Sequence, residues 1–302
     1  MYPRRFSVTF AGVTGVAVSA MGQCTPSWSG YAGPMLDNGV YAVTSWDPDG
    51  PGPALPVVVA GGNFEHIGAS PLSFVGRWDG GAWLPMGPGV SGTVLCATVW
   101  DPDGFGPDPA RPFIGGFFSQ SAGTTLNCIG WFDGAGWQPL GSGFGGVPVL
   151  PSVSSMVGEG MGLVASGVFA TAGGQPAHEI ARWNGGAWLP FTNDLFAFDA
   201  LAMHADVLHA GGGFSMPGAP QIAVVRWNGL AWETLGTNYP RVDVNALTTY
   251  RGQLIAAGAF TNTCCGNPPA PGEFIARFDG TTWLPLGTGL NGGVRALCVF
   301  DP

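Results

Sequence analysis

The sequence predicts an all-β fold made of repeated four-stranded units, and three recurring patterns indicate it. The clearest is a hairpin motif typified by residues 77–87, RWDGGAWLPMG. In this motif Asp-Gly follows an aromatic residue and precedes a Trp, which is a strong signal for a β-hairpin. Further copies, with Asp-Gly or Asn-Gly, lie at residues 130–140, 182–191, 226–232 and 277–286, and the turn residue returns after 54, 51, 44 and 51 residues.

The other two patterns precede each hairpin. A strand that ends in small residues and Phe occurs at residues 61–64, 115–118, 166–169, 212–214 and 258–260. A short apolar strand begins most units, at residues 40–43, 94–97, 199–202, 244–247 and 294–297. Glycine at a strand end allows two backbones to approach closely. No segment has a sustained helical period with capping residues.

One unit therefore contains four strands, which the last complete copy illustrates in order. The first, residues 244–250, is apolar and β-branched, and the second, 253–259, ends in small residues. The third, 274–279, carries the aromatic residue before the turn, and the fourth, 282–286, opens on Trp. Units of this length with four antiparallel strands are typical of the blades of a β-propeller. Its Trp and Phe side chains would be buried between neighbouring blades.

The di-glycine after an apolar strand, followed later by Trp-x-Pro-Leu/Met, resembles the kelch repeat. The chain also resembles secreted, glycine-rich bacterial repeat proteins whose units read RWDG..W..LG and AGGxF. Both resemblances cover about residues 27–302 and imply a propeller like that of kelch and galactose-oxidase-like proteins. The kelch pattern usually has a Tyr between the di-glycine and the Trp, and this chain lacks it as a consistent feature. The copper-binding residues of galactose oxidase have no counterpart here.

The two ends of the chain predict how the ring closes. Residues 28–40 resemble residues 283–294, so Trp28 would begin a lone fourth strand. Residues 294–300 would form a lone first strand. The sequence thus predicts five full repeats plus an incomplete sixth, in a propeller that is six-bladed when complete. Residues 23–302 form this single domain, which we expect to be truncated at its C-terminus.

The N-terminus predicts export. Arg4 and Arg5 precede an uncharged, largely apolar stretch, and small residues follow at a plausible cleavage site, so residues 1–22 read as a signal peptide. We therefore expect a secreted or cell-surface protein, extracellular or periplasmic. The net charge of -9, with no lysine, argues against binding of nucleic acid, and no membrane span is predicted in the rest of the chain.

Six cysteines are present, and export makes disulfides the expected state. Cys264 and Cys265 are adjacent in a loop that other repeats lack. Because vicinal cysteines rarely bridge each other, we expect one or both to reach Cys128.

Polar motifs suggest only one metal candidate. Asp47, Asp49, Asp101 and Asp103 stand in two copies of Asp-Pro-Asp-Gly, which echoes the start of a calcium loop. Distal ligands are absent, and Pro and Asp also form ordinary turns, so a turn is the favoured interpretation and Ca²⁺ the weaker one. No other cofactor is predicted.

The remaining charged residues are assigned structural roles. Four arginines recur at one position of the repeat, which indicates a structural role and not a ring of substrate-binding residues. They are Arg77, Arg182, Arg226 and Arg277. The four histidines fall at different positions of their repeats, and His204 and His209 could meet across a hairpin turn.

The favoured function is a non-catalytic binding or scaffold module for a protein or glycan on one rim. The irregular loops at residues 101–112, 148–155 and 261–273 are the expected contact points. One alternative is a secreted carbohydrate-active enzyme, a hydrolase, lyase or oxidase, that uses the central depression. Another is a structural repeat domain of a large cell-surface protein. No catalytic residue is predicted.

Overall fold

The fold was analysed in a computed structural model that describes residues 35–50, 52–68, 70–104, 106, 109–146, 150–191, 198–214, 222–236, 243–260 and 273–299. Over these ranges the regular structure consists of strands only, and five antiparallel sheets contain four strands each. The all-β prediction is therefore confirmed. No helix in the same ranges has the length and apolar character needed to cross a membrane.

Each four-stranded sheet is a meander in which the strands follow chain order, and we call the sheets blades 1 to 5. Blade 1 consists of β1 (Val40–Trp46), β2 (Val57–Gly62), β5 (Val75–Trp78) and β6 (Trp83–Pro85). Blade 2 consists of β7 (Val94–Trp100), β8 (Arg111–Gly116), β11 (Ile129–Phe132) and β12 (Trp137–Pro139). Blade 3 consists of β14 (Ser152–Glu159), β15 (Gly162–Val168), β18 (Ile180–Trp183) and β19 (Trp188–Pro190). Blade 4 consists of β20 (Ala200–His204), β21 (Val207–Phe214), β22 (Ile222–Trp227) and β23 (Trp232–Thr234). Blade 5 consists of β24 (Val244–Tyr250), β25 (Gln253–Gly258), β26 (Ile275–Phe278) and β27 (Trp283–Pro285).

Small extra hairpins, which the sequence did not predict, lie between second and third strands. They are β3 (His66–Ile67) with β4 (Ser70–Pro71), β9 (Gln120–Ser121) with β10 (Thr124–Thr125), and β16 (Thr171–Ala172) with β17 (Gln175–Pro176). β13 (Phe144–Gly145) pairs with β16 and extends the third of them.

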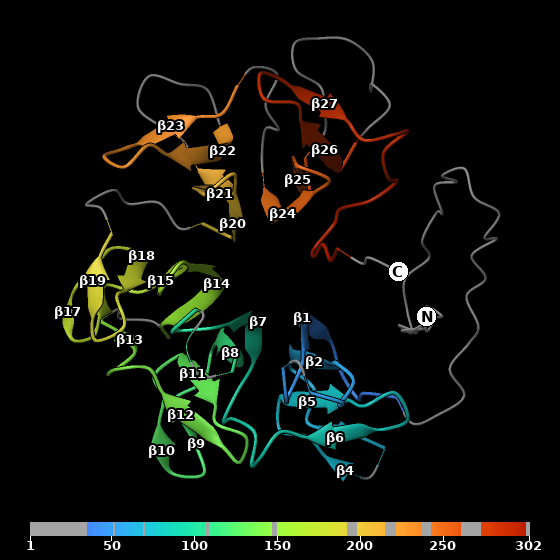
Figure 1. The fold of residues 1–302 in the computed structure, drawn as a ribbon, viewed down its shortest axis with the longest axis vertical. Helices are drawn as coiled ribbons and strands as arrows, with labels where there is room; N and C mark the ends of the chain where they lie inside the picture. The colour runs from blue at the N-terminus through green and yellow to red at the C-terminus, as the bar shows by residue number, and fades with distance from the viewer. Residues whose placement is uncertain are drawn as a thin grey trace.

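The blades are arranged around a centre with their first strands innermost (Figure 1). β1 packs against β7, β7 against β14, β14 against β20, and β20 against β24. No comparable contact joins β24 back to β1 among the described residues. This arrangement is consistent with a β-propeller, in which the described chain makes five blades and leaves one seam unjoined.

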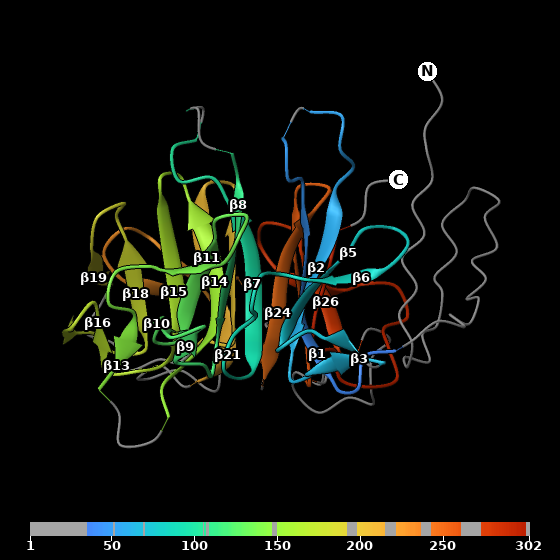
Figure 2. The ribbon, with the colours of Figure 1, turned by 90° about the horizontal axis from the view of Figure 1, so that it is seen from below.

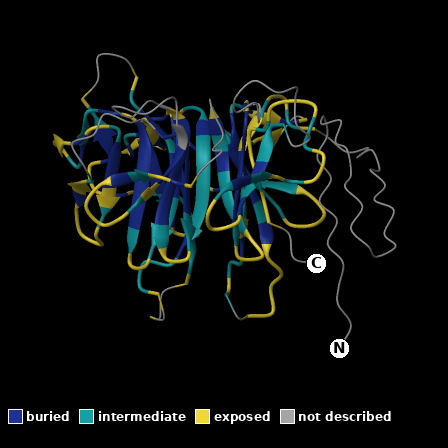
Figure 3. Ribbon diagram, turned by 90° about the horizontal axis from the view of Figure 1, so that it is seen from above, coloured by how far each residue is buried: buried dark blue, intermediate teal, exposed yellow. Residues whose placement is uncertain are grey.

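The core lies between the blades, as the dark strands of Figure 3 illustrate. One apolar cluster joins blades 1 and 2, and others join blades 2 and 3, 3 and 4, and 4 and 5. A Phe that follows the second strand is buried in four blades, namely Phe64, Phe118, Phe169 and Phe260. Removing such side chains from water is the main stabilising term of a repeat architecture.

The meander divides the loops between two ends of the molecule (Figure 2). The hairpin end carries the first-to-second connections and the third-to-fourth turns, and the linker end carries the second-to-third connections and the links between blades. Residues 101–104 and 109–110 therefore lie at the opposite end from residues 150–151, so these two predicted contact loops do not share one rim. Residues 261–272 of the third loop lie outside the described residues. Residues 152–155 also belong to β14, so the prediction of a loop there was wrong.

The predicted closure of the ring involves both ends of the chain. Residues 1–34, with the signal peptide, Cys24 and Trp28, lie outside the described residues. Residues 294–299 are described and form no strand. They nevertheless dock on blade 5, because Val294 N–H donates to Gly258 O at 3.0 Å and Asn245 Nδ2 donates to Val294 O at 3.0 Å. A sixth blade is therefore not formed by the described part of the chain.

Candidate functional site

The repeated turn residue builds the hairpins. In each blade one Asp or Asn oxygen accepts backbone N–H groups two and three residues further on, at 2.8–3.0 Å; the residues are Asp79, Asp133, Asn184, Asn228 and Asp279. The next residue is always a glycine with φ between 95° and 104°. These hydrogen bonds lower the pKa of the three Asp carboxyls, and the largest effect comes from the backbone N–H three residues after each Asp. These residues are scaffold.

The Trp that opens the fourth strand joins neighbouring blades. Trp137 Nε1 donates to Met86 O at 3.0 Å, Trp188 Nε1 to Leu140 O at 2.9 Å, and Trp283 Nε1 to Leu235 O at 2.9 Å. Each acceptor directly follows the fourth strand of the preceding blade. In blade 4 the equivalent Nε1 of Trp232 is buried and has no hydrogen-bond partner among the residues that the structure describes.

The first strands of blades 1 and 2 also end in a Trp, and its indole N–H donates to a carbonyl of the next blade. Trp46 Nε1 donates to Ala110 O and Trp100 Nε1 to Gly160 O, both at 3.1 Å. The Trp residues that make these five bonds thus join neighbouring blades, and we assign them a structural role.

The recurring arginines lie on third strands, away from the innermost strands of the ring. Arg182 forms an ion pair with Glu159, and Arg226 forms one with Glu233 at 3.2 Å. Arg77 and Arg277 act electrostatically on the turn carboxylates of their own hairpins. The architectural interpretation agrees with these contacts, because the four side chains do not converge on a common point.

His204 and His209 meet across their hairpin, as predicted, with ring centroids 5.6 Å apart. His209 Nδ1 lies 2.9 Å from Val207 O, so this nitrogen carries the proton and donates it. Burial lowers the pKa of His209 to about 4, so the ring is neutral at physiological pH. His204 Nδ1 lies 3.2 Å from Thr249 Oγ1 in blade 5. No group of three His, Cys, Asp or Glu side chains suited to a metal occurs in the described ranges.

The candidate calcium residues make local turn contacts. Asp49 Oδ2 accepts from Ala54 N–H at 3.0 Å, and Asp47 Oδ1 accepts from Asp49 N–H at 3.4 Å. Asp101 Oδ1 accepts from the N–H groups of Asp103 and Gly104 at 3.3 and 3.1 Å. The bonds that Asp47 and Asp101 accept from two and three residues further on are those of Asx-type turns, which fits the favoured interpretation.

The described cysteines are free thiols, namely Cys96, Cys128 and Cys298. Cys128 Sγ donates to Pro151 O at 3.1 Å instead of forming the predicted bridge, and Cys264 and Cys265 lie outside the described residues. Burial raises the pKa of Cys128 to about 11, which makes it a poor nucleophile near neutral pH.

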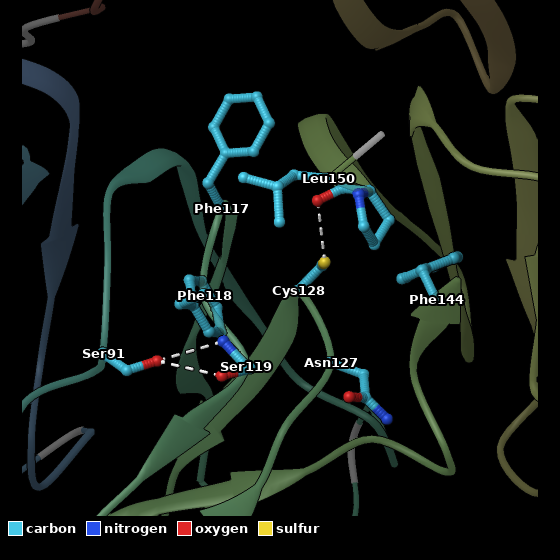
Figure 4. Close-up of a pocket in the computed structure, with 9 residues that line it drawn as sticks. Ser91, Phe117, Phe118, Ser119, Asn127, Cys128, Phe144 and Leu150 are labelled. Carbon is cyan, nitrogen blue, oxygen red and sulfur yellow. Dashed lines mark hydrogen bonds between the residues drawn. The ribbon is translucent and has the colours of Figure 1, made fainter. Parts of the chain in front are cut away.

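A pocket of about 190 Å³ opens at the linker end between blades 2 and 3 (Figure 4). Its lining residues are Ser91, Phe117, Phe118, Ser119, Asn127, Cys128, Phe144, Leu150 and Pro151. Five of these nine are apolar, and none is charged. We call this feature the linker-end pocket.

Two polar side chains of the linker-end pocket form hydrogen bonds with the scaffold. Ser91 Oγ accepts the N–H groups of Ser119 and Gln120, each at 3.1 Å. Asn127 Nδ2 donates to Ser142 O at 2.9 Å. The surface offered to a ligand is therefore mainly aromatic and aliphatic.

Phe117 and Leu150 flank the mouth of this pocket (Figure 4). They are 42% and 73% exposed, which is unusual for such large apolar side chains. Phe118 is the buried Phe common to the blades, whereas Phe117 stands where other repeats have Asn63, Val168, Gly213 or Ala259. Val168, also exposed, pairs with Ser152 next to Pro151 and extends the apolar surface onto blade 3.

β-Bulges shape the same end of the innermost strands. The register shifts by one residue at Tyr41, Leu95, Ser154 and Asn245, and Asp199 stands at the equivalent place just before β20. Bulges re-aim side chains and are common next to binding sites. Ser154 Oγ donates to Phe198 O at 3.2 Å, so the segment that follows Pro151 contacts the start of blade 4 beside Asp199.

Asp199 is exposed to solvent. The pKa of its carboxyl is nevertheless raised, first by partial desolvation within the surrounding protein and second by the negative charge of Asp243. Neither Asp199 nor the linker-end pocket was predicted. The available signal for the pocket was the departure of Phe117 from the repeat consensus.

Comparisons with known proteins identify no family. No family model matches the sequence, and no curated protein matches it. Among solved structures, the chain is similar to Saccharomyces cerevisiae Sqt1, with 12% identity and a TM-score of 0.46 over 83% of this chain and 63% of that one. The chain therefore spans less than two thirds of Sqt1. A similarity of this size transfers no function, and the kelch-like likeness stays a resemblance.

Proposed function

We propose that this protein is an exported, non-catalytic β-propeller module that binds a protein partner at the linker-end pocket. The observation that carries the proposal is the pair of exposed apolar side chains, Phe117 and Leu150, at the mouth of a pocket without charged groups. Large exposed apolar groups at a concave site are typical of protein-binding surfaces. The thiol of Cys128 is the one titratable group in the lining, and its raised pKa speaks against catalysis there.

A protein partner is favoured over a glycan by the walls of the pocket. Leu150 and Pro151 are aliphatic, and Ser91 Oγ and Asn127 Nδ2 are bonded to the scaffold. Sugar hydroxyl groups would find few free polar partners in such a site. A partner's aliphatic or aromatic side chain would bury apolar surface there without leaving polar atoms unpaired.

Two parts of the proposal concern residues outside the described ranges. Export rests on Arg4, Arg5 and the apolar stretch that follows them. A sixth blade rests on the spacing of Trp28, which precedes Trp83 by about one repeat, and on the seam between β24 and β1.

Panning of random dodecapeptides on the immobilised protein tests the binding site. We expect the selected peptides to bind wild type and to lose binding to the F117S/L150S double variant. The matched control is M161S/L230S, which removes two side chains that are 71% and 90% exposed at the hairpin end. Selected peptides that bind F117S/L150S as well as wild type would refute the proposed site. Phe117-dependent binding on a glycan array, without peptide binding, would replace the protein partner with a glycan.

A further inference from the structure

The linker end is chemically divided around the mouth of the ring. Blades 1 and 2 and the link to blade 3 present apolar side chains there, with Tyr41 and Leu95 at the bulges and Phe117 and Leu150 at the pocket. Tyr41, like Phe117 and Leu150, is among the exposed large apolar residues. At the bulge positions of blades 3, 4 and 5 the side chains are polar, namely Ser154, Asp199 and Asn245, and Asp243 directly precedes β24.

The polar half carries uncompensated negative charge. Asp199 and Asp243 are both exposed, and Asp243 acts on Asp199 as a like charge. The ion pairs found elsewhere in the described chain involve other residues, namely Asp37, Glu159 and Glu233. The whole sequence has a net charge of -9, so the long-range field also attracts cations.

The two halves are connected through the backbone. Pro151, in the pocket lining, is followed by Ser152 at the start of β14, and Ser154 donates to Phe198 O next to Asp199. One extended segment of a partner can therefore contact the pocket and the acidic side of the mouth together.

We propose that the linker-end pocket takes a partner segment in which an apolar side chain is accompanied by a basic residue. This inference rests on the proposed function. The apolar side chain occupies the space beside Phe117 and Leu150, and the Arg or Lys faces Asp199 and Asp243. Charge complementarity of this kind adds specificity and association rate more than affinity.

The dodecapeptides selected on the wild-type protein also test this chemistry. We expect enrichment of Leu, Ile, Met or Phe together with Arg or Lys. For one synthetic selected peptide, fluorescence anisotropy should show D199N/D243N weakening binding about threefold or more at low salt, as two exposed charges allow. The difference should shrink in about 0.5 M NaCl because salt screens exposed charges. D206N, which removes an exposed charge from the turn after β20, is the matched control and should bind as wild type.

The outcomes separate the two proposals. Apolar enrichment without basic residues, or equal binding by wild type and D199N/D243N, overturns this inference and leaves the proposed pocket standing. Enrichment of acidic residues overturns it as well. Binding that survives in F117S/L150S overturns the proposed function, and this inference with it.

Discussion

At the scale of single residues, the hairpin turn shows how one side chain and one glycine specify a local structure. Asn184 Oδ1 accepts two backbone N–H groups, and Gly185 follows with φ of 95°. An L-residue rarely adopts that φ, whereas glycine does so without steric cost. The turn was predictable from sequence because both requirements are met by neighbouring residues.

Gly185→Ala and Gly186→Ala make a matched test of this account. A Cβ on Gly185 meets no atom within 4 Å, so the cost of that substitution comes from the backbone conformation alone. We expect Gly185→Ala to lower the free energy of unfolding by about 1–2 kcal/mol. Gly186→Ala should be nearly neutral, since Ala135, Leu230 and Thr281 occupy this position in other blades. Urea unfolding followed by Trp fluorescence measures both, and equal midpoints would refute the explanation.

At the scale of elements, the repeat predicts the strand order and the packing of the blades. A strand that departs from the repeat pattern, such as β14, was recognised only in the structure. The four strands of blade 5 match their predicted ranges closely. β14 was missed because its sequence, SVSSMVGE, is rich in Ser and lacks the apolar character of other first strands. It forms a strand because β15 offers it a complete antiparallel partner and β7 and β20 pack beside it. Tertiary context here overrides local propensity.

Trp188→Phe and Trp232→Phe test the bonds between blades. Both side chains are buried in aromatic clusters, but Trp188 Nε1 donates to Leu140 O while Trp232 Nε1 has no partner. Losing a bond and leaving a buried carbonyl unpaired costs about 1–2 kcal/mol beyond the loss of apolar contact. We therefore expect Trp188→Phe to be the more destabilising change by that amount in chemical denaturation. Equal effects would show that the indole N–H groups contribute nothing to blade docking.

At the scale of the whole molecule, the seam between blades 5 and 1 differs from the other seams, because β24 and β1 do not pack against each other in the described chain as the other neighbouring first strands do. In blades 2, 3 and 5 the Trp that opens the fourth strand donates to the carbonyl that follows the preceding fourth strand, whereas Trp83 of blade 1 is only half-buried. By the same spacing, the proposed sixth blade would bring Trp28 against blade 5. A ring held together at every seam loses cooperativity when one seam is removed.

Trp28→Ala tests that closure in the full chain. If Trp28 is buried at the seam, the substitution should lower the free energy of unfolding by about 3–5 kcal/mol, as large buried side chains do. Ser29→Ala serves as the neighbouring control and should leave stability unchanged. A Trp28→Ala variant that unfolds at the same temperature as Ser29→Ala would exclude a role for Trp28 in closing the ring.

The repeat, most of its strands and the structural role of the Asp/Asn-Gly turns and Trp residues were predictable from the sequence, because they depend on short-range periodicity that five copies reinforce. Which loops share an end, the bond from Cys128 to Pro151 and the linker-end pocket became evident only in the folded chain. The pocket joins Ser91, Phe117, Asn127 and Leu150, which are far apart in the chain. Their proximity follows from how one blade docks on the next, and no local pattern encodes that distance.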